Sequence, residues 1–469
     1  MRHESEVSGL KSCVFRYPDM SIIKGLDIGK RAILAQMDAI KTAGQNIANV
    51  NTPGYSRQRL ELKTIVYGDQ DSPYVFRACR IRDRFIDQRI WSENSSLGNW
   101  KMQSLMYGQI ESVFLEPSEY DLNNALAEFW NSWEELATNP ENMASRSTVV
   151  QSGMAVSQHI NSLDSQLRSL REVADGYVED RVAQINDIAS RIADINVQIV
   201  AMEASGEEAS EVRDSRDLLV EQMSELVDVT VLERENGLSL LIGGRAIVDG
   251  EEFTAIEIQQ SSNGGMMVSD IVWSSDGTSV RISSGELAGL MILRDEVIPE
   301  ILAEVDQLAS TLIDEVNAIH ATGYGLDGST GLDFFTGTGA FDIECNSEIV
   351  DDVRKVAASQ NGEAGDNSIA LAIAELANQD IAPNNTDIGT FYSNIVNTLG
   401  AQSRSASVME ESAGMFVTHI KEQRESISGV SLDEEAANLI NFQRAYEAAA
   451  EYISVIDELI GTLIDMVRS

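Results

Sequence analysis

The sequence predicts a mainly α-helical protein: a long helical bundle or coiled coil formed by the N- and C-terminal regions, with a small all-β domain inserted. Three observations predict this fold class. Apolar residues recur at three- and four-residue spacing over long stretches, as they do on one face of a helix. Aromatic residues make up only 6% of the 469 residues, and only 7 are prolines, so few residues break helices. Glycine-containing turns concentrate in residues 229–284, a pattern typical of short strands.

The chain begins with a segment that lacks any periodic pattern. Residues 1–19 are polar and aperiodic, and we predict an extra, disordered segment that reflects an upstream start codon or a flexible arm. Residues 20–60 are predicted to form an assembly helix and a turn, although Lys30 and Gly44 interrupt the apolar face of this helix. That face repeats every seven residues and comprises Leu26, Ile33, Ile40 and Ile47.

A turn is predicted where this helix ends. Pro53 lacks a backbone N–H and biases Thr52 towards an extended conformation, and Gly54 provides the positive φ that a type II turn requires. We therefore expect the helix to give way here to the next segment, and we assign the turn residues to the N-terminal assembly site. They are Asn49, Asn51, Thr52, Pro53, Gly54 and Tyr55. Residues 57–90 are then predicted to be extended, with strand-like clusters at Ile65, Val66, Tyr74, Val75 and Phe76.

The next region, residues 61–228, is predicted to contain these extended pieces followed by a helical domain. Pro140 sits in a typical helix-start pattern. Two runs of apolar residues at 3-4 spacing then follow, over 160–177 and 185–202, but they are out of phase. The mismatch, near residues 178–182, is typical of a stutter in a coiled coil.

The second half of the chain alternates in composition. Residues 229–284 are predicted to form the small β domain, and residues 285–430 the second part of the helical domain, with a helix over 286–321. The glycine-rich segment 323–339 contains aspartates but lacks the alternating ligands of an EF-hand. We therefore interpret it as a turn and not as a calcium loop.

The most regular helix is predicted at the end of the chain, in residues 431–469. Ser431 followed by Glu434 forms a capping box that opens it. Its apolar residues repeat at three- and four-residue spacing and form a stripe along one face. Such a stripe is typical either of packing inside one domain or of a face held for a partner. We assign its members to a C-terminal assembly and chaperone-binding site: Leu439, Phe442, Tyr446, Ile453, Ile456, Ile460, Leu463 and Val467.

Charge limits the choice of partners. The chain has 34 basic and 75 acidic residues, a net charge of -41, which repels nucleic acid and anionic membranes. Residues 20–63 nevertheless carry seven basic and three acidic residues, whereas residues 431–469 carry eight acidic and two basic ones. The two ends are therefore complementary and predicted to pair within or between subunits, unless the asymmetry is a chance property of an acidic protein.

The sequence offers no pattern typical of an enzyme. Its three cysteines and four histidines lack metal-ligand spacing, and no nucleophile–base or phosphate-loop motif is present. We therefore predict no catalytic residues, no cofactor, no metal and no enzymatic activity. No run of 18 apolar residues exists and no cleavable signal is recognisable at the start, so we expect no membrane insertion.

Two segments resemble a known family. Residues 45–57 (QNIANVNTPGYSR) and residues 431–446 (SLDEEAANLINFQRAY) resemble the N- and C-terminal signatures of bacterial flagellar axial proteins. Over about residues 20–469 the chain is similar to the hook-associated members of that family. The resemblance implies a structural protein that joins hook to filament through paired terminal helices. Its implied partners are further copies of itself, the hook protein and the next hook-associated protein.

The same resemblance implies a route of export. Such proteins are cytoplasmic at first and leave the cell through the flagellar type III export apparatus, after an export chaperone has bound the C-terminal helix. Two alternatives remain. The chain is either another axial protein, of the hook or the rod, or, more distantly, a wall hydrolase carried by the axial structure.

Overall fold

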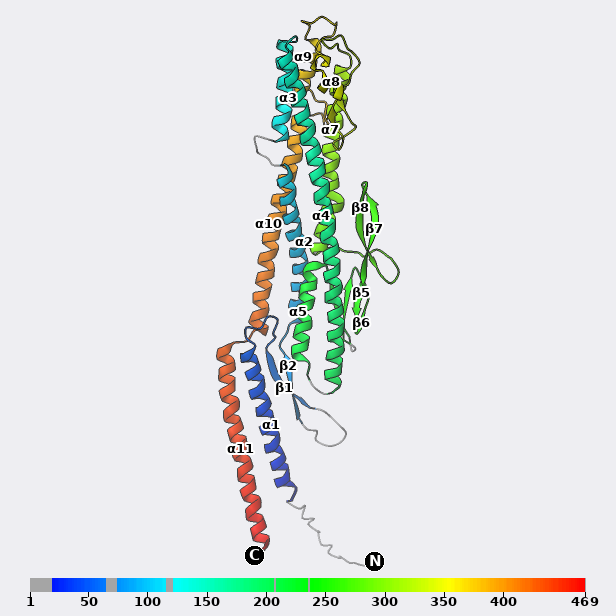
Figure 1. The fold of residues 1–469 in the computed structure, drawn as a ribbon. Coiled ribbons are helices and arrows are strands. Elements are labelled where there is room, and N and C mark those ends of the chain that lie inside the picture. The colour runs from blue at the N-terminus through cyan, green and yellow to red at the C-terminus, as the bar shows by residue number, and fades with distance from the viewer. Residues whose placement is uncertain (1–18, 65–73, 115–120, 206–207, 235–236, 469) are drawn as a thin grey trace, which may run out of the picture. The chain divides into compact units, whose positions relative to one another are not determined.

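The computed structural model describes residues 19–64, 74–114, 121–205, 208–234 and 237–468. Contacts divide the chain into two compact units. Unit 1 contains the described parts of residues 1–84, 202–215 and 422–469, and unit 2 contains those of residues 85–201 and 216–421. Long helices with a few short antiparallel sheets make up both (Figure 1), which confirms the predicted fold class.

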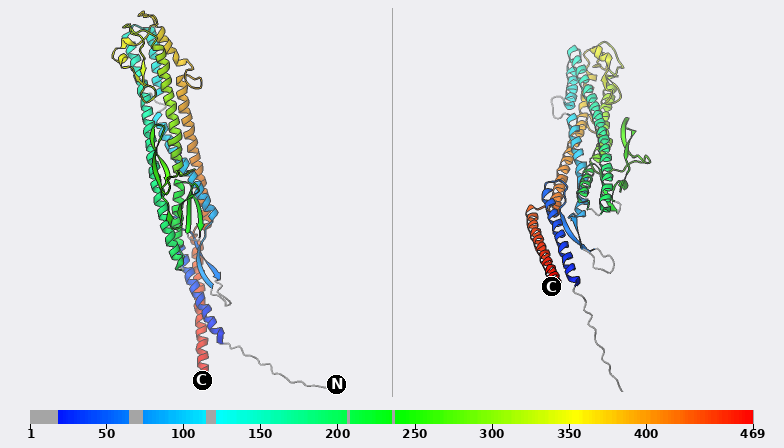
Figure 2. Two further views of the ribbon diagram at one scale, coloured as in Figure 1. Left: turned by 90° about the vertical axis from the view of Figure 1, so that its right-hand side faces the viewer. Right: turned by 60° about the horizontal axis from the view of Figure 1, so that its bottom comes forward.

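Unit 1 brings the two ends of the chain together. Its helices α1 and α11 lie side by side in every view (Figure 1, Figure 2), and β1 pairs with β2 in an antiparallel hairpin, from Gln58 opposite Arg80 to Thr64 opposite Tyr74. Residues 1–18 of the predicted disordered segment, and Ile65 and Val66 of the predicted strand-like clusters, lie outside the described residues. The elements of unit 1 are α1 (Asp19–Ala48), β1 (Gln58–Thr64), β2 (Tyr74–Arg80) and α11 (Leu432–Arg468).

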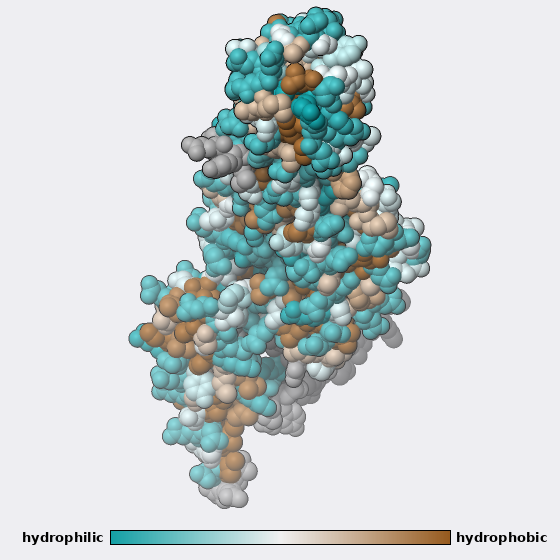
Figure 3. All heavy atoms as spheres, turned by 45° about the horizontal axis from the view of Figure 1, so that its top comes forward, coloured by the Kyte–Doolittle hydropathy of each residue, from teal (hydrophilic) through white to brown (hydrophobic). Residues whose placement is uncertain are grey.

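The buried face of α1 consists of small residues. Ala35, Ala39 and Ala43 are at most 5% exposed, and a Cβ atom added to Gly29 would lie 2.6 Å from Cγ1 of Ile453 on α11. At Gly29 the two helices therefore approach too closely to leave room for a side chain. Large apolar residues of both helices remain exposed, and apolar surface is visible over this part of the molecule (Figure 3).

Unit 2 is a bundle of long helices, of which α2, α4, α5 and α10 also contribute residues to unit 1. One hydrophobic core runs through it. Its helices are α2 (Arg84–Phe114), α3 (Leu122–Thr138), α4 (Met143–Ala204), α5 (Ser210–Leu226), α6 (Glu286–Ile292), the π-helical turn η1 (Leu293–Val297), α7 (Ile298–His320), α8 (Ser347–Asp351), the 3₁₀ turn η2 (Val353–Lys355), α9 (Ser368–Glu375), the 3₁₀ turn η3 (Leu376–Asn378) and α10 (Ile388–Ser428).

The predicted extended region proved too long. Strand structure ends at Arg80, and α2 begins at Arg84, so the prediction for residues 84–90 is wrong. Ile86 and Ile90 are both buried, four residues apart, as on one face of a helix. The pattern was hard to recognise because polar residues, Asn94 among them, share the buried face of α2.

Within α4 the apolar face continues through the predicted stutter. Ala174, Val178 and Val182 are all buried, so two four-residue steps follow one another where the two apolar runs change phase. The helix predicted over 286–321 is interrupted by a π-helical turn at Leu293–Val297, which the apolar spacing did not indicate. There the buried Arg294 donates to Asp175 at 2.6 Å and to the Ser269 carbonyl at 2.8 Å.

The strands within the predicted range 229–284 are attached to α4 by side-chain amides. Asn186 donates to the Ile256 carbonyl at 2.8 Å and accepts from the Ile256 amide at 3.0 Å. Asn196 donates in the same way to the Leu238 and Gly250 carbonyls. The strands are β3 (Thr230–Arg234), β4 (Gly237–Ile242), β5 (Arg245–Asp249) and β6 (Glu252–Phe253) in one sheet, and β7 (Ile256–Asn263) and β8 (Met266–Trp273) in a second; β9 (Phe335–Thr336) and β10 (Glu344–Cys345) form a third pair.

Candidate assembly site

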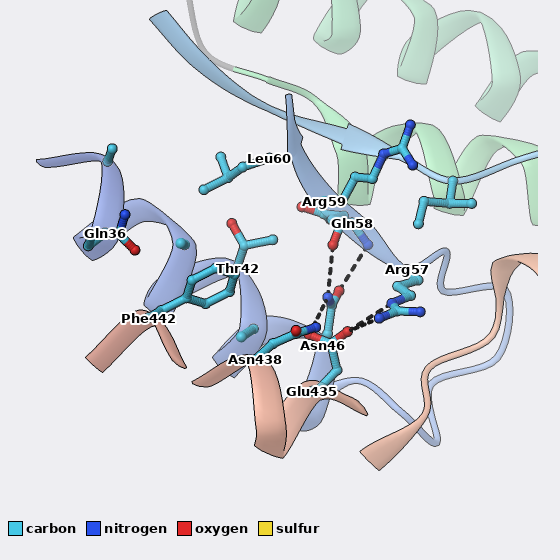
Figure 4. A pocket seen from close by; sticks show the side chains of 14 residues that line it. Gln36, Thr42, Asn46, Arg57, Gln58, Arg59, Leu60, Glu435, Asn438 and Phe442 are labelled. Atoms are coloured by element: carbon cyan, nitrogen blue, oxygen red, sulfur yellow. Dashed lines mark hydrogen bonds and ion pairs between the residues drawn. The ribbon is translucent and has the colours of Figure 1, made fainter. Parts of the chain in front are cut away.

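The two signature segments meet at Asn46, a buried amide on α1 that is 1% exposed. Its Nδ2 donates to the Gln58 carbonyl at 2.9 Å and to Glu435 Oε2 at 3.1 Å. Its Oδ1 accepts from the Gln58 amide at 3.0 Å and from the Tyr55 hydroxyl at 2.8 Å. All the hydrogen-bonding capacity of this side chain is therefore used to join α1, the turn, β1 and α11. Figure 4 shows its contacts with Gln58 and Glu435.

Arg57 connects the same point to the start of α11. It pairs with the buried Glu435 through Nε at 2.8 Å and through a second guanidinium nitrogen at 2.6 Å, and with the exposed Glu434 at 2.8 Å. Burial acts to lower the pKa of Arg57, but the hydrogen bonds with the two carboxylates outweigh it and raise that pKa. The complementary ends of the chain thus pair within one subunit.

The turn between α1 and β1 places these groups. The Tyr55 amide donates to the Thr52 carbonyl at 3.2 Å, and Gly54 has a φ of 79°, as the predicted type II turn requires. The Arg57 amide then donates to the carbonyl of Ser428 at the end of α10. The backbone therefore holds Arg57 in position independently of its side chain.

A second buried contact fixes the turn to the start of α5. The Ser56 amide donates to Asp214 Oδ2 at 3.0 Å, and Arg80 on β2 donates to Asp214 Oδ1 at 2.9 Å. Burial raises the pKa of Asp214, although the contacts with Ser56 and Arg80 oppose this effect. Burial, followed by the charge of Asp214, also raises the pKa of the Tyr55 phenol above its usual range. The phenol therefore stays neutral and keeps its donor role towards Asn46.

The residues predicted for the N-terminal site lie mostly at the surface of unit 1. Leu26 is 39% exposed, and Ile33, Ile40 and Ile47 are half-buried. Asn49 donates to the Gln45 carbonyl and accepts from the Thr52 hydroxyl. Asn51, Thr52, Pro53 and Gly54 are exposed, whereas Tyr55 is half-buried against Asn46.

The predicted C-terminal residues are placed in a similar way. Ile456, at 7% exposure, is buried, and Leu439, Phe442, Ile453 and Ile460 are half-buried. Tyr446 and Leu463 are 36% and 43% exposed. The side chain of Val467 lies outside the described residues. Most of this stripe is thus at least partly covered within unit 1, with Tyr446 and Leu463 left exposed, and its role in assembly stays a prediction.

Several residues of the site were not predicted individually. Asn46, Arg57, Gln58 and Glu435 form its centre, and Asp214 reaches it from the middle of the chain. Asn46 and Arg57 lie in the quoted N-terminal segment, and Glu435 lies in the C-terminal one. For Asn46, Arg57 and Glu435 the available signal was a polar residue inside a family signature. No sequence pattern around Asp214 indicated its role.

Replacing Gly29 with alanine is expected to loosen α1 from α11. The new Cβ would lie 2.6 Å from Ile453 Cγ1, and we expect such overpacking to destabilise the helix pair by about 1–2 kcal/mol. Gly44→Ala is the matched control, because nothing lies within 4 Å of its Cβ position, and it should stabilise α1 by up to about 1 kcal/mol. Hydrogen exchange of the amides of α1 and α11 measures both effects. Equal responses of the two variants would contradict close packing at Gly29.

The described residues contain no group of three or more His, Cys, Asp or Glu side chains arranged to hold a metal ion. None of their helices combines the length and apolar composition needed to cross a membrane. The arrangement at Asn46, Arg57 and Glu435 joins α1, β1 and α11, and we interpret it as a structural joint.

Comparison with known proteins gives consistent results. Residues 107–335 match the helical domain of the flagellar hook-associated protein FlgK, and residues 421–466 match the C-terminal region of the flagellar basal body rod proteins FlgEFG. The chain is 29% identical to flagellar hook-associated protein 1 of Bacillus subtilis strain 168, covering 95% of this chain and 98% of that protein. It is 23% identical to the protein of the same name from Escherichia coli strain K12, covering 92% and 97%.

A solved structure shares the fold. The flagellar hook junction protein FlgK from Burkholderia pseudomallei aligns with a TM-score of 0.66 at 14% identity, covering 73% of this chain and 100% of that one. The family models, the nearly full-length relatives and the shared fold all agree with the two terminal signatures. The chain therefore belongs to the flagellar hook-associated protein 1 family and is a structural protein of the bacterial flagellum.

Proposed function

We propose that this chain forms the junction between the flagellar hook and filament, and that its paired ends α1 and α11 are the element through which copies assemble. The buried joint at Asn46, Arg57 and Glu435 is the observation that carries the proposal. It fixes the start of α11 against the end of α1, so the two helices form one unit that presents a shared outer surface.

That outer surface suits contacts with neighbouring subunits. On α1 the exposed large apolar residues are Leu26, Ile28, Leu34 and Met37, and on α11 they include Ile440, Tyr446, Tyr452, Val455, Leu459, Leu463, Ile464 and Met466. Burying one aliphatic side chain contributes about 1.5–3 kcal/mol. Several such contacts per subunit offset the repulsion between copies that each carry a net charge of -41. The proposed neighbours are further copies, the hook protein and the next hook-associated protein.

The exposed apolar residues of α11 serve a second proposed role. Before export through the flagellar type III apparatus, a chaperone covers the α11 stripe and keeps the chain from assembling in the cytoplasm. Chaperone and neighbouring subunits would use one surface, so they exclude one another. This explains how assembly is delayed until after export.

Deletion of residues 439–469 tests the proposal. We expect the truncated chain neither to attach to hooks on living cells nor to bind the chaperone, and we expect cells that rely on it to lack filaments. A double variant, Leu459→Ser with Leu463→Ser, removes only apolar contacts and should weaken attachment. The matched control is Glu447→Ser with Glu451→Ser, which changes exposed polar positions on the same helix. Normal filament attachment by the truncated chain would disprove the role of α11.

Immuno-electron microscopy of isolated flagella separates the proposed function from its alternatives. Label at the boundary of hook and filament supports the junction role, whereas label along the hook or the rod supports another axial protein. A zymogram against peptidoglycan tests the wall hydrolase alternative, for which we expect no clearing.

A further inference from the structure

A cavity of about 560 Å³ lies in unit 2, between one face of α2 and the two chain segments that lead into and out of the β insert. Residues 228–231 and 283–284 form its wall opposite α2. Its volume falls in the range of sites that hold a small ligand. The residues that α2 contributes recur at three- and four-residue spacing, as on one face of a helix; they are Gln88, Trp91, Ser92, Ser95 and Ser96.

Hydroxyl groups dominate the lining of this cavity. Five serines and one threonine contribute to it, together with one aromatic ring, two valines, one amide and one carboxylate. Serine is depleted at protein–protein interfaces, and the buried centre of such an interface is apolar. No lysine or arginine among the described residues lines the cavity, so an anionic ligand finds no opposite charge there. The lining therefore suits a small neutral ligand with several hydrogen-bonding groups.

The hydroxyl of Ser95 lacks a partner within the protein. Ser95 is 3% exposed, and its Oγ atom is buried without a hydrogen-bond partner in the part of the chain that the structure describes. A serine in a helix can bond back to a carbonyl of the preceding turn, as Ser112 of the same helix does with the Gln109 carbonyl at 2.6 Å. A buried polar group that makes no such bond is unfavourable. Since a hydroxyl both donates and accepts, a ligand hydroxyl satisfies Ser95 in either direction.

The carboxylate of Asp228 is fixed on the opposite wall. Its Oδ1 accepts from the Ser283 amide at 3.0 Å, and its Oδ2 accepts from the Ser283 hydroxyl at 2.6 Å. The Asp228 amide donates to the Ser284 carbonyl at 3.2 Å, and the Gly285 amide donates to the Ser95 carbonyl at 3.0 Å, so this wall is held against α2. Each carboxylate oxygen can accept a second hydrogen bond. The site is therefore formed before a ligand arrives and keeps acceptor capacity for it.

Trp91 supplies the apolar part of the site. Its half-buried ring packs against the core of unit 2 and also lines the cavity. An indole ring is a large and rigid apolar surface, against which the C–H groups of a flat ligand can lie. A sugar ring combines such a C–H face with neutral hydroxyls that donate and accept. An extended peptide at the edge strand β3 is the alternative, but it offers one N–H and one C=O per residue and matches the hydroxyl-rich lining less well.

We infer that this cavity binds a neutral sugar ring, with the C–H face of the ring on Trp91 and its hydroxyls at Ser95 and Asp228. The inference goes beyond the proposed function and does not depend on it, because the site lies in unit 2 and uses neither α1 nor α11. A free saccharide, a glycan strand of the cell wall and a glycan carried by another protein share this chemistry.

Saturation-transfer NMR with the full-length chain tests the inference. The probes are three neutral disaccharides (maltose, lactose and N,N′-diacetylchitobiose) and the acidic sugar glucuronic acid. We expect transfer to the ring C–H protons of at least one neutral probe and none to glucuronic acid, because the lining offers Asp228 and no cation. Absence of transfer to all three neutral probes overturns the inference, and so does equal transfer to glucuronic acid.

Substitutions on α2 locate the bound sugar. Trp91→Ala should weaken binding of the neutral probe about tenfold or more, through loss of the stacked ring. Ser95→Ala should weaken it about threefold to tenfold without lowering the Tm, because its Oγ has no protein partner and alanine is favoured in helices. Ser112→Ala, on the same helix but outside the cavity lining, is the matched control and should bind normally. Unchanged affinity in Ser95→Ala or Trp91→Ala overturns the inference.

Two further samples identify the source of the sugar. The unmodified chain is sedimented with purified peptidoglycan, and with flagellar filaments before and after chemical removal of their glycans. Binding to either material supports the inference when Ser95→Ala weakens it and Ser112→Ala does not. Binding of a serine-rich extended peptide in place of any sugar would instead assign the cavity to strand addition at β3, and it would overturn the inference.

Discussion

Glu435→Ala is expected to free the start of α11 from α1 and β1 and to lower the local stability of the helix pair by about 2–3 kcal/mol. Glu435 is 3% exposed and accepts hydrogen bonds from both Asn46 and Arg57. The substitution removes the carboxylate that accepts one hydrogen bond from Asn46 Nδ2, and it leaves Arg57 without its buried partner. The effect is large because the remaining polar groups stay buried.

Glu434 is the matched control, one residue away on the same helix. Its side chain is 63% exposed and pairs with Arg57 at 2.8 Å, and exposed ion pairs contribute at most about 1 kcal/mol. Hydrogen exchange of the amides around Asn46 and Glu435 should accelerate roughly thirtyfold or more in Glu435→Ala and less than about fivefold in Glu434→Ala. Similar acceleration in the two variants would show that the joint does not depend on the buried carboxylate.

The second large effect is a loss of stability in acid that depends on His320 in unit 2. This imidazole is 1% exposed; its Nδ1 contacts the Leu332 carbonyl at 2.6 Å, and its Nε2 accepts from the Ala357 amide at 2.9 Å. Nδ1 must therefore carry the proton in a neutral ring, and a second proton would break the contact with Ala357. Burial lowers the pKa of His320 from 6.5 to about 4.

The direction of the pH effect follows from that shift. The unfolded chain binds a proton at His320 near pH 6.5, whereas the folded chain does so only near pH 4. Stability from this group is therefore complete above pH 6.5 and is lost as the pH falls towards 4, by about 3 kcal/mol in total.

Urea unfolding between pH 4 and pH 7 measures this effect. His320→Gln should be less stable at pH 7 but should lose less stability on acidification than the unmodified chain. His419→Gln, at an exposed position of α10, should retain the full dependence. If the free energy of unfolding of His320→Gln falls with pH as steeply as that of the unmodified chain, other groups control the loss of stability in acid.

The sequence by itself indicated the long terminal helices, the helices after residue 140 and the short strands within 229–284, because these follow from local periodicity and turn residues. The capping box at Ser431, the positive φ at Gly54 and the apolar stripe of α11 are properties of short segments. Residues 84–90 were misassigned because buried polar side chains in α2 disguised its helical period. The charge difference between the two ends also indicated that they attract one another.

Only the tertiary structure decided which faces are buried. The heptad residues Leu26 and Ile33 are larger apolar side chains of α1, yet Ala35, Ala39 and Ala43 are the ones that are buried. Close approach of two helices favours small side chains, and that preference depends on a partner hundreds of residues away in the sequence. The joint of Asn46, Arg57, Glu435 and Asp214 was out of reach for the same reason, since Glu435 reaches Asn46 and Arg57, and Asp214 reaches Ser56, only through contacts between distant segments.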